Sequence, residues 1–205
     1  MFNGEQLVVD AGGNEETVSI GNVDLAGNTF SANFAYPHAA NVPVTVRGGF
    51  ASGIVPPSMA KGSTGTILKI FGDIHGKGSL VYVEYTCDTT GGNLYRNSVP
   101  VTAASKPAVT TGQILLDNIQ PNPGGAPCFA YQQKTVGADT FVVGVAMTLT
   151  RTTEFIDPVT NQRQTETQVL WNMSPRNIFE TWELASLGVA NRIQPMPASV
   201  LNLVP

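Results

Sequence analysis

The chain alternates between short apolar or β-branched stretches and turns rich in glycine, proline and asparagine. Successive side chains of a strand point to opposite faces of a sheet, so this pattern is typical of antiparallel strands joined by turns. Segments rich in proline, glycine, threonine or alanine predict loops at 51–65 and 100–112. The predicted strands cover residues 6–9, 16–20, 29–34, 42–46, 66–71, 80–87, 93–97, 114–119, 128–132, 141–150 and 164–173.

The strongest alternation lies in the penultimate predicted strand, and it predicts one dry face. Residues 164–173 return across a turn at 157–162, which together predict a long antiparallel hairpin. Val169 and Trp171 of the returning strand are expected on the dry face. The side chains predicted to be buried beside them are Phe141, Val143, Val145, Met147 and Leu149. The side chains predicted to face solvent are Thr148 and Thr150.

One helix is predicted, over residues 177–188. Asn177 followed by Glu180 has the pattern of a capping box, and a glycine closes the segment. A helix of about ten residues is marginal in isolation, so we expect it to dock on the sheet through Trp182. The proline-rich tail at 189–205 is predicted to be extended.

These elements predict a mainly β protein, an antiparallel and sandwich-like β-sheet domain with one short C-terminal helix. The predicted organisation is a single β-rich domain over residues 1–205. Its parts are an N-terminal strand and loop region at 1–65, a core antiparallel sheet at 66–176, the helix at 177–188 and the tail at 189–205.

Composition limits the classes of partner. The 205 residues are 42% hydrophobic and 13% charged, which provides enough apolar material for a sizeable core. A formal net charge of −4 leaves no basic excess, so we expect binding neither to nucleic acid nor to an anionic membrane surface. The sequence has no apolar run of about 18 residues, and its first residues lack the pattern of a signal peptide. A polar but weakly charged chain of this kind is typical of exported surface proteins.

Cys87 and Cys128 are the only cysteines, too few for a four-cysteine zinc site. A disulfide between them is expected in an exported protein, and two buried thiols in a cytosolic one. We predict the disulfide, because each cysteine lies at the end of a predicted strand beside a turn. A weaker alternative is a small hydrolase that uses one of these cysteines as its nucleophile.

The sequence contains little that supports catalysis. His38 and His75 are the only histidines, and both are expected to be exposed and unpaired. The segment 73–78 resembles a calcium loop, but Lys77 stands where an oxygen ligand is needed, which favours a plain hairpin tip. Glu84 is expected to be half exposed at a sheet edge. Motifs for serine hydrolases, phosphate-binding loops and zinc proteases are missing, so we predict no enzymatic activity, no cofactor and no metal site.

A series of short motifs runs from residue 73 to residue 194. Its parts are Asp73-x-His75-Gly76-x-Gly78, Gly92-Asn93-Leu94-Tyr95-Arg96, Leu115-Leu116-Asp117-Asn118-Ile119, Pro127-Cys128-Phe129-x-Tyr131, Asp157-Pro158-x-Thr160 and Ser174-Pro175-Arg176-Asn177. In this order the motifs resemble the C-terminal domain of type IV pilus minor pilins and J-type pseudopilins. In that family a strand closes on Leu-x-Arg, a Leu-Leu-x-Asn-Val segment follows, and a terminal strand pair ends in Pro-Arg-Asn.

The resemblance implies a pilin-like β-domain and an exported protein at the cell surface or facing the periplasm. It implies a non-enzymatic role in a type IV pilus or related filament, in assembly, surface attachment or uptake, with other pilin subunits as partners. The resemblance implies membrane contact only through the family's N-terminal apolar helix. That helix and the family's processing site are not in this sequence. The alternative functions are a viral or phage structural β-protein and a secreted carbohydrate-binding module.

Overall fold

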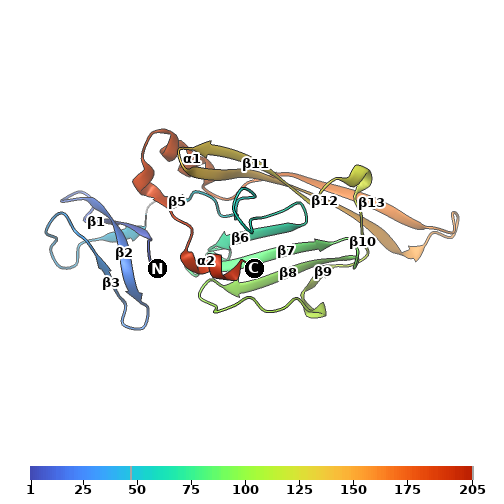
Figure 1. The fold of residues 1–205 in the computed structure, drawn as a ribbon, viewed down its shortest axis with the longest axis horizontal. Coiled ribbons are helices and arrows are strands. Elements are labelled where there is room, and N and C mark those ends of the chain that lie inside the picture. The colour runs from blue at the N-terminus through green and yellow to red at the C-terminus, as the bar shows by residue number, and fades with distance from the viewer. Residues whose placement is uncertain (47, 205) are drawn as a thin grey trace.

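The computed structural model describes residues 1–46 and 48–204, and their fold is mainly β, as predicted. Two antiparallel sheets are stacked in the middle of the molecule, a small N-terminal sheet lies at one end, and a long hairpin projects at the other (Figure 1). The described strands pair antiparallel, except for one short parallel pair between β5 (Gly49–Phe50) and β14 (Ile193–Gln194).

The first of the two stacked sheets has the strand order β6-β7-β8-β9. A glycine-rich tip joins β6 to β7, where Asp73 accepts hydrogen bonds from the backbone N–H groups of Lys77 and Gly78. The segment 73–78 is therefore a hairpin tip, as predicted. The strands are β6 (Ile67–Gly72), β7 (Val81–Asp88), β8 (Asn93–Pro100) and β9 (Ile114–Leu116).

The second stacked sheet is built around β12, the longest strand of the described chain. β11 and β10 pair with successive parts of β12, and β13 also pairs with β12. The hairpin formed by β12 and β13 was predicted from its alternation. The strands are β10 (Ile119–Gln120), β11 (Phe129–Val136), β12 (Asp139–Ile156) and β13 (Arg163–Met173).

The N-terminal sheet has its own small core and the strand order β3-β2-β1-β4. Gln194 ties this sheet to the rest of the chain, because its side chain exchanges two hydrogen bonds with the backbone of Gln6. Arg192 adds an ion pair to Glu15 at 2.8 Å. The strands are β1 (Gln6–Val9), β2 (Glu16–Asp24), β3 (Thr29–Ala32) and β4 (Val44–Val46). Its buried apolar side chains are Leu7, Val9, Val18 and Ile20.

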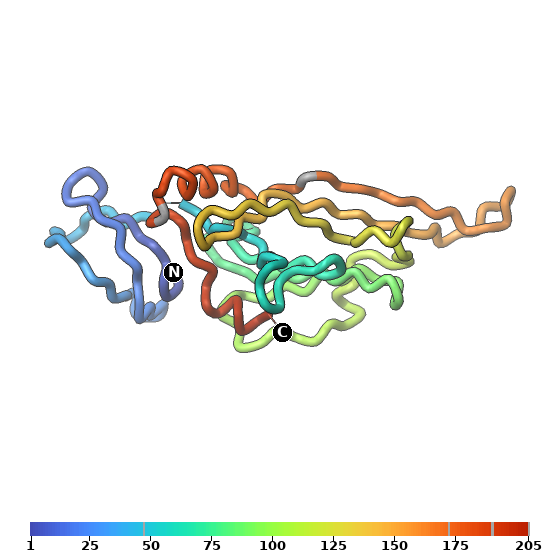
Figure 2. Tube along the Cα trace, turned by 45° about the horizontal axis from the view of Figure 1, so that its top comes forward, coloured from blue at the N-terminus to red at the C-terminus, as the bar shows by residue number. Residues whose placement is uncertain are grey.

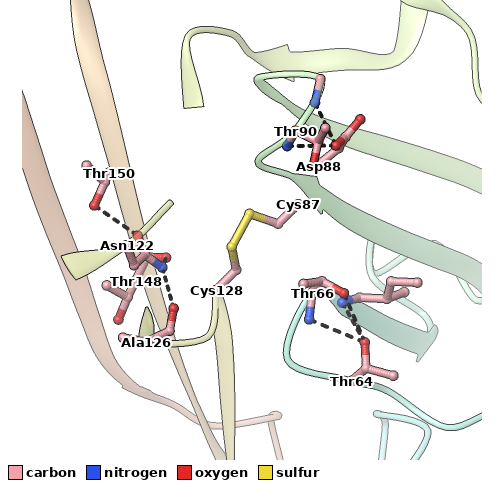
Figure 3. The surroundings of a disulfide bond; sticks show 12 residues. Thr64, Thr66, Cys87, Asp88, Thr90, Asn122, Ala126, Cys128, Thr148 and Thr150 are labelled. Carbon is pink, nitrogen blue, oxygen red and sulfur yellow. Dashed lines mark hydrogen bonds between the residues drawn. A yellow bond between two sulfur atoms is a disulfide. The ribbon is translucent and has the colours of Figure 1, made fainter. Parts of the chain in front are cut away.

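A disulfide joins the two stacked sheets. Cys87 lies near the end of β7 and Cys128 immediately precedes β11, so the bond crosses the core from one sheet to the other (Figure 3). The predicted disulfide is present in the structure. The buried side chains around it come from both sheets and the preceding loop: Ile54, Leu68, Leu94, Ile119, Phe129, Val142 and Val145.

A β-bulge in β12 divides the apolar face that the alternation predicted. The register with β11 shifts between Gln132 and Gln133, opposite the segment from Val142 to Gly144. One extra residue reverses the side to which the following side chains point. Phe141 and Val143 therefore pack against the helix α1, while Val145, Met147 and Leu149 pack in the core between the sheets.

Other expectations for this hairpin were wrong. Thr150 is buried rather than solvent-facing. Its hydroxyl is satisfied there, because it donates to Asn122 Oδ1 at 2.9 Å and pairs with the hydroxyl of Thr167. Val169 and Trp171 are exposed rather than buried. The alternation correctly indicated a strand here, but the position of β13 beyond the edge of the core leaves its apolar side chains uncovered.

Two helices cover the outer sides of the stacked sheets (Figure 1). The predicted helix is α1 (Ile178–Ser186). It contacts β12 through a small apolar cluster, and Trp182 packs against that cluster as expected. Its predicted capping box is wrong: Asn177 has a positive φ of 68° and makes no side-chain cap. The tail also differs from the extended segment expected, since it contains η3 (Ala190–Arg192), β14 and α2 (Ala198–Leu203), and α2 packs against the β6–β9 sheet.

Candidate functional site

The free ends of β12 and β13 form a two-stranded projection, which we call the hairpin arm and define as residues 152–170. Both views show it extending beyond the stacked sheets (Figures 1 and 2). β11 pairs with β12 only up to Met147 and β10 only up to Arg151, so the outer part of β12 has β13 as its one partner in the described chain. A two-stranded ribbon beyond the sheet buries little apolar surface.

Large apolar side chains stand in solvent along this arm and at its base. Val159 at the tip is 91% exposed, Phe155 is 80% exposed, and Trp171 at the base is 75% exposed. Ile156 and Leu170 are also exposed. Single exposed apolar residues are ordinary, but the grouping of several on one projecting element makes the arm the candidate functional site.

The tip of the arm is a well-defined turn. Asp157 accepts hydrogen bonds from the backbone N–H groups of Val159 and Thr160, at 2.7 and 3.2 Å. These donors, that of Val159 first, hold the pKa of Asp157 below its ordinary value, because they stabilise the ionised carboxylate. The exposed Val159 is thus presented on an ordered turn.

A polar clamp fixes the base of the arm. Asn122 donates to the backbone carbonyls of Ala126 and Thr148 and accepts from Thr150, so one side chain ties the β10–β11 connection to β12 (Figure 3). Asn122 is buried, and each of these bonds lies between 2.9 and 3.1 Å. The sequence does not single out Asn122, because a polar residue in a Pro/Gly turn is also typical of an ordinary exposed turn.

Two hollows open beside the base of the arm. The first, of about 410 Å³, lies between the sheets and is lined mostly by apolar side chains, Leu68, Ile70, Leu115 and Met173 among them. The second, of about 310 Å³, includes Leu116, Leu149 and Leu170. The apolar surface of the arm therefore continues into the open side of the sandwich.

The structure corrects the expectation for His38. Its Nε2 lies 2.6 Å from a Glu16 carboxylate oxygen and its Nδ1 lies 3.4 Å from an Asp10 oxygen, so the ring is half-buried and paired. His75 is exposed, as predicted. The two nitrogens of His38 face different carboxylates. We call His38, Asp10 and Glu16 the clip, because they join the end of β1 and the start of β2 to the loop between β3 and β4. Proximity across 22 and 28 residues of sequence could not be read from the chain.

This clip predicts a pH dependence of stability. The hydrogen bond to Glu16 raises the pKa of His38 above 6.5, so its contribution is complete below that pH and is lost as pH rises through the raised pKa. The backbone N–H of Ala35 and then His38 lower the pKa of Glu16 below 4.5, so that contribution is lost only as pH falls further. The N-terminal sheet should be most stable between these limits. Thermal unfolding should show that His38→Gln costs stability at pH 5.5 and costs less at pH 8.5.

A double-mutant comparison provides the control. In a Glu16→Gln background, His38→Gln should cost less than in the native sequence, because the partner that raises the pKa of His38 is gone. An equal cost of His38→Gln at both pH values would contradict the clip.

The two cysteines and Glu84 complete the positions singled out from the sequence. Both cysteines are in the disulfide, so neither is a free nucleophile. Glu84 is buried, not half exposed, and its carboxylate binds the ammonium group of Lys106 and the hydroxyl of Tyr82. No hydrogen bond of the described residues joins a histidine to either cysteine.

Over the described residues, no group of three or more histidine, cysteine, aspartate or glutamate side chains is arranged to hold a metal ion. No helix in the described ranges is long and apolar enough to cross a membrane. Comparison of the chain with protein-family models, curated proteins and solved structures finds no match.

Proposed function

We propose that this chain is a non-enzymatic structural subunit of an exported filament of the type IV pilus kind, and that it binds neighbouring subunits through the hairpin arm. The observation that carries the proposal is the ordered arm with Val159 and Phe155 in solvent and Trp171 exposed at its base. Leaving such side chains in water is unfavourable, and covering them in a subunit contact removes that cost.

The resemblance to minor pilins supports the same function. The motif Ser174-Pro175-Arg176-Asn177 directly follows β13 and leads into α1, where the family has the end of its terminal strand pair. The disulfide fits an exported protein, because such bonds persist in oxidising compartments.

The partner for which the surface has matching chemistry is a second copy of this chain. β11 and β13 are both edge strands of one sheet, and each presents an unpaired backbone edge over much of its length. Antiparallel pairing of β13 with β11 of a neighbour can place Glu166 opposite Lys134. The same register places Thr165 opposite Thr135, and both pairs are favourable across strands.

A charge exchange tests this pairing. Glu166→Lys should weaken self-association of the purified chain about tenfold, and Lys134→Glu should do the same, because each puts like charges opposite one another. The double exchange should restore association in sedimentation velocity experiments. Glu154→Lys changes an exposed carboxylate of the same arm outside the register, and it should have a much smaller effect.

In the producing cell, the chain should be recovered with sheared surface filaments, and a Trp171→Ser variant should be reduced there while remaining folded. Recovery in the cytosol with two free thiols would contradict the proposal. If the purified native chain and each of its charge variants are monomeric, the proposed pairing with a second copy is wrong.

A further inference from the structure

Two buried side chains and a half-buried lysine meet on the side of the β6–β9 sheet that faces away from the disulfide. Glu84 on β7 is directly opposite Asn97 on β8. Lys106 reaches this pair from the loop after β8. Asn97 is 2% exposed and Glu84 is 4% exposed.

The amine and the amide are close to the same carboxylate. Lys106 Nζ lies 2.7 and 2.8 Å from the two carboxylate oxygens of Glu84. Directly opposite residues of an antiparallel pair have Cβ atoms about 5 Å apart, so the Asn97 amide is adjacent to Glu84. Asn97 Nδ2 also donates to the carbonyl of Pro107 at 2.9 Å, the residue that follows Lys106. Both side chains are therefore fixed in one small volume.

The Asn97 carbonyl is polarised by a positioned donor. Gln113 Nε2 donates to Asn97 Oδ1 at 3.0 Å. Gln113 Oε1 accepts the backbone N–H of Thr110 at 2.8 Å, which orients the Gln113 amide. A donor aimed at the carbonyl oxygen stabilises the negative charge that develops there when a nucleophile attacks the carbon.

A buried tyrosine also binds the Glu84 carboxylate. Tyr82 donates its hydroxyl to Glu84 at 2.8 Å, and its ring packs in the core around α2. These bonds and the burial of Glu84 hold its carboxylate beside the Lys106 amine.

We infer that Lys106 and Asn97 form an intramolecular isopeptide bond, with Glu84 as the proton carrier. Glu84 takes a proton from the Lys106 ammonium, and the free amine attacks Asn97 Cγ. A new C–N bond forms and the C–Nδ2 bond breaks. The proton carried by Glu84 and the proton released by the attacking nitrogen both leave with Nδ2, as an ammonium ion. No oxidant or reductant is needed, and Glu84 ends as it began.

Lys69 is the other lysine beside Glu84, which it faces from β6. Its Nζ donates to the backbone carbonyl of Lys61 at 2.9 Å, and β7 separates it from Asn97. Lys69 therefore serves as the matched control for Lys106.

The intact mass of the purified full chain tests the bond. The expected mass is lower than that of the disulfide-bonded sequence by one ammonia, and reduction of the disulfide should not change that difference. In the reduced tryptic peptide 97–134, fragment ions should be missing between Asn97 and Lys106, because the bond closes a ring there. A wild-type mass equal to that of the disulfide-bonded sequence overturns the inference without any variant.

Variants identify the bonded groups. Lys106→Arg, Glu84→Gln and Asn97→Ala should each have the full mass of their disulfide-bonded sequence. Lys69→Arg should be lighter than its sequence by one ammonia, like the native chain. A succinimide at Asn97 has the same mass as the isopeptide, but hydroxylamine cleaves a succinimide and leaves an isopeptide intact. Loss of ammonia that persists in Lys106→Arg, or that hydroxylamine reverses by chain cleavage, contradicts the bond.

Discussion

Replacing Cys87 and Cys128 together by alanine should lower the free energy of unfolding by about 4 kcal/mol, as the loop-entropy relation gives for a loop of this size. The two cysteines are 41 residues apart in sequence and join β7 to the start of β11. Without the bond, the unfolded chain gains the freedom to separate these points. The folded sheets are then held together by the apolar core and by hydrogen bonds such as that from the Tyr131 hydroxyl to the carbonyl of Ile67. Urea unfolding of the native and double-alanine proteins measures the difference.

Reduction provides a control that does not alter the side-chain volume. Native protein unfolded without reductant should show no free thiol, and reduced native protein should unfold at nearly the same urea concentration as the double-alanine variant. A stability unchanged by both reduction and replacement would show that the bond does not hold the sheets together.

Phe141→Ala should cost about 3 to 5 kcal/mol, because it removes a fully buried ring and leaves a cavity. Phe141 is 0% exposed and packs with Val143, Ile178 and Ala185, so its loss also weakens the docking of α1 on β12. Urea unfolding followed by far-UV circular dichroism measures the cost.

Phe155→Ala is the matched control, since it changes the same residue type on the same strand. Phe155 lies in the hairpin arm and is mostly exposed, so its truncation should change the free energy of unfolding by less than about 0.5 kcal/mol. Equal costs for the two variants would contradict the burial of Phe141 and the exposure of the arm.

Local sequence pattern predicted most of the strands, because alternation and turn residues act over a few neighbouring positions. β7 and the β12–β13 hairpin were found in this way, and so was α1, which has an apolar side that must dock. The pattern could not predict the bulge opposite Gln132 and Gln133, since a bulge depends on the register with a partner strand. One strand therefore appeared to have one dry face where it has two.

The buried polar groups depended on contacts between residues distant in sequence. Glu84 has the pattern of a half-exposed strand residue until Lys106 reaches it from 22 residues away. His38 likewise depends on contacts with Glu16 and Asp10, which are distant in sequence. Asn122 depends in the same way on Thr150. A charged or polar group is stable in the interior only when a partner satisfies it, and the sequence does not show which partner comes near.

The sequence by itself determined that this protein is a mainly β chain and indicated a bond between its two cysteines, because periodicity, turn residues and the paucity of charge are local or compositional properties. The tertiary structure decided which faces are dry and which apolar residues remain in water. Trp171 and Phe141 are both large aromatic residues on neighbouring strands, yet one is exposed and the other buried. The physical reason is that burial is set by what packs against a strand. The helix α1 covers Phe141, whereas β13 is an edge strand and its outer part projects beyond the stacked sheets (Figure 1).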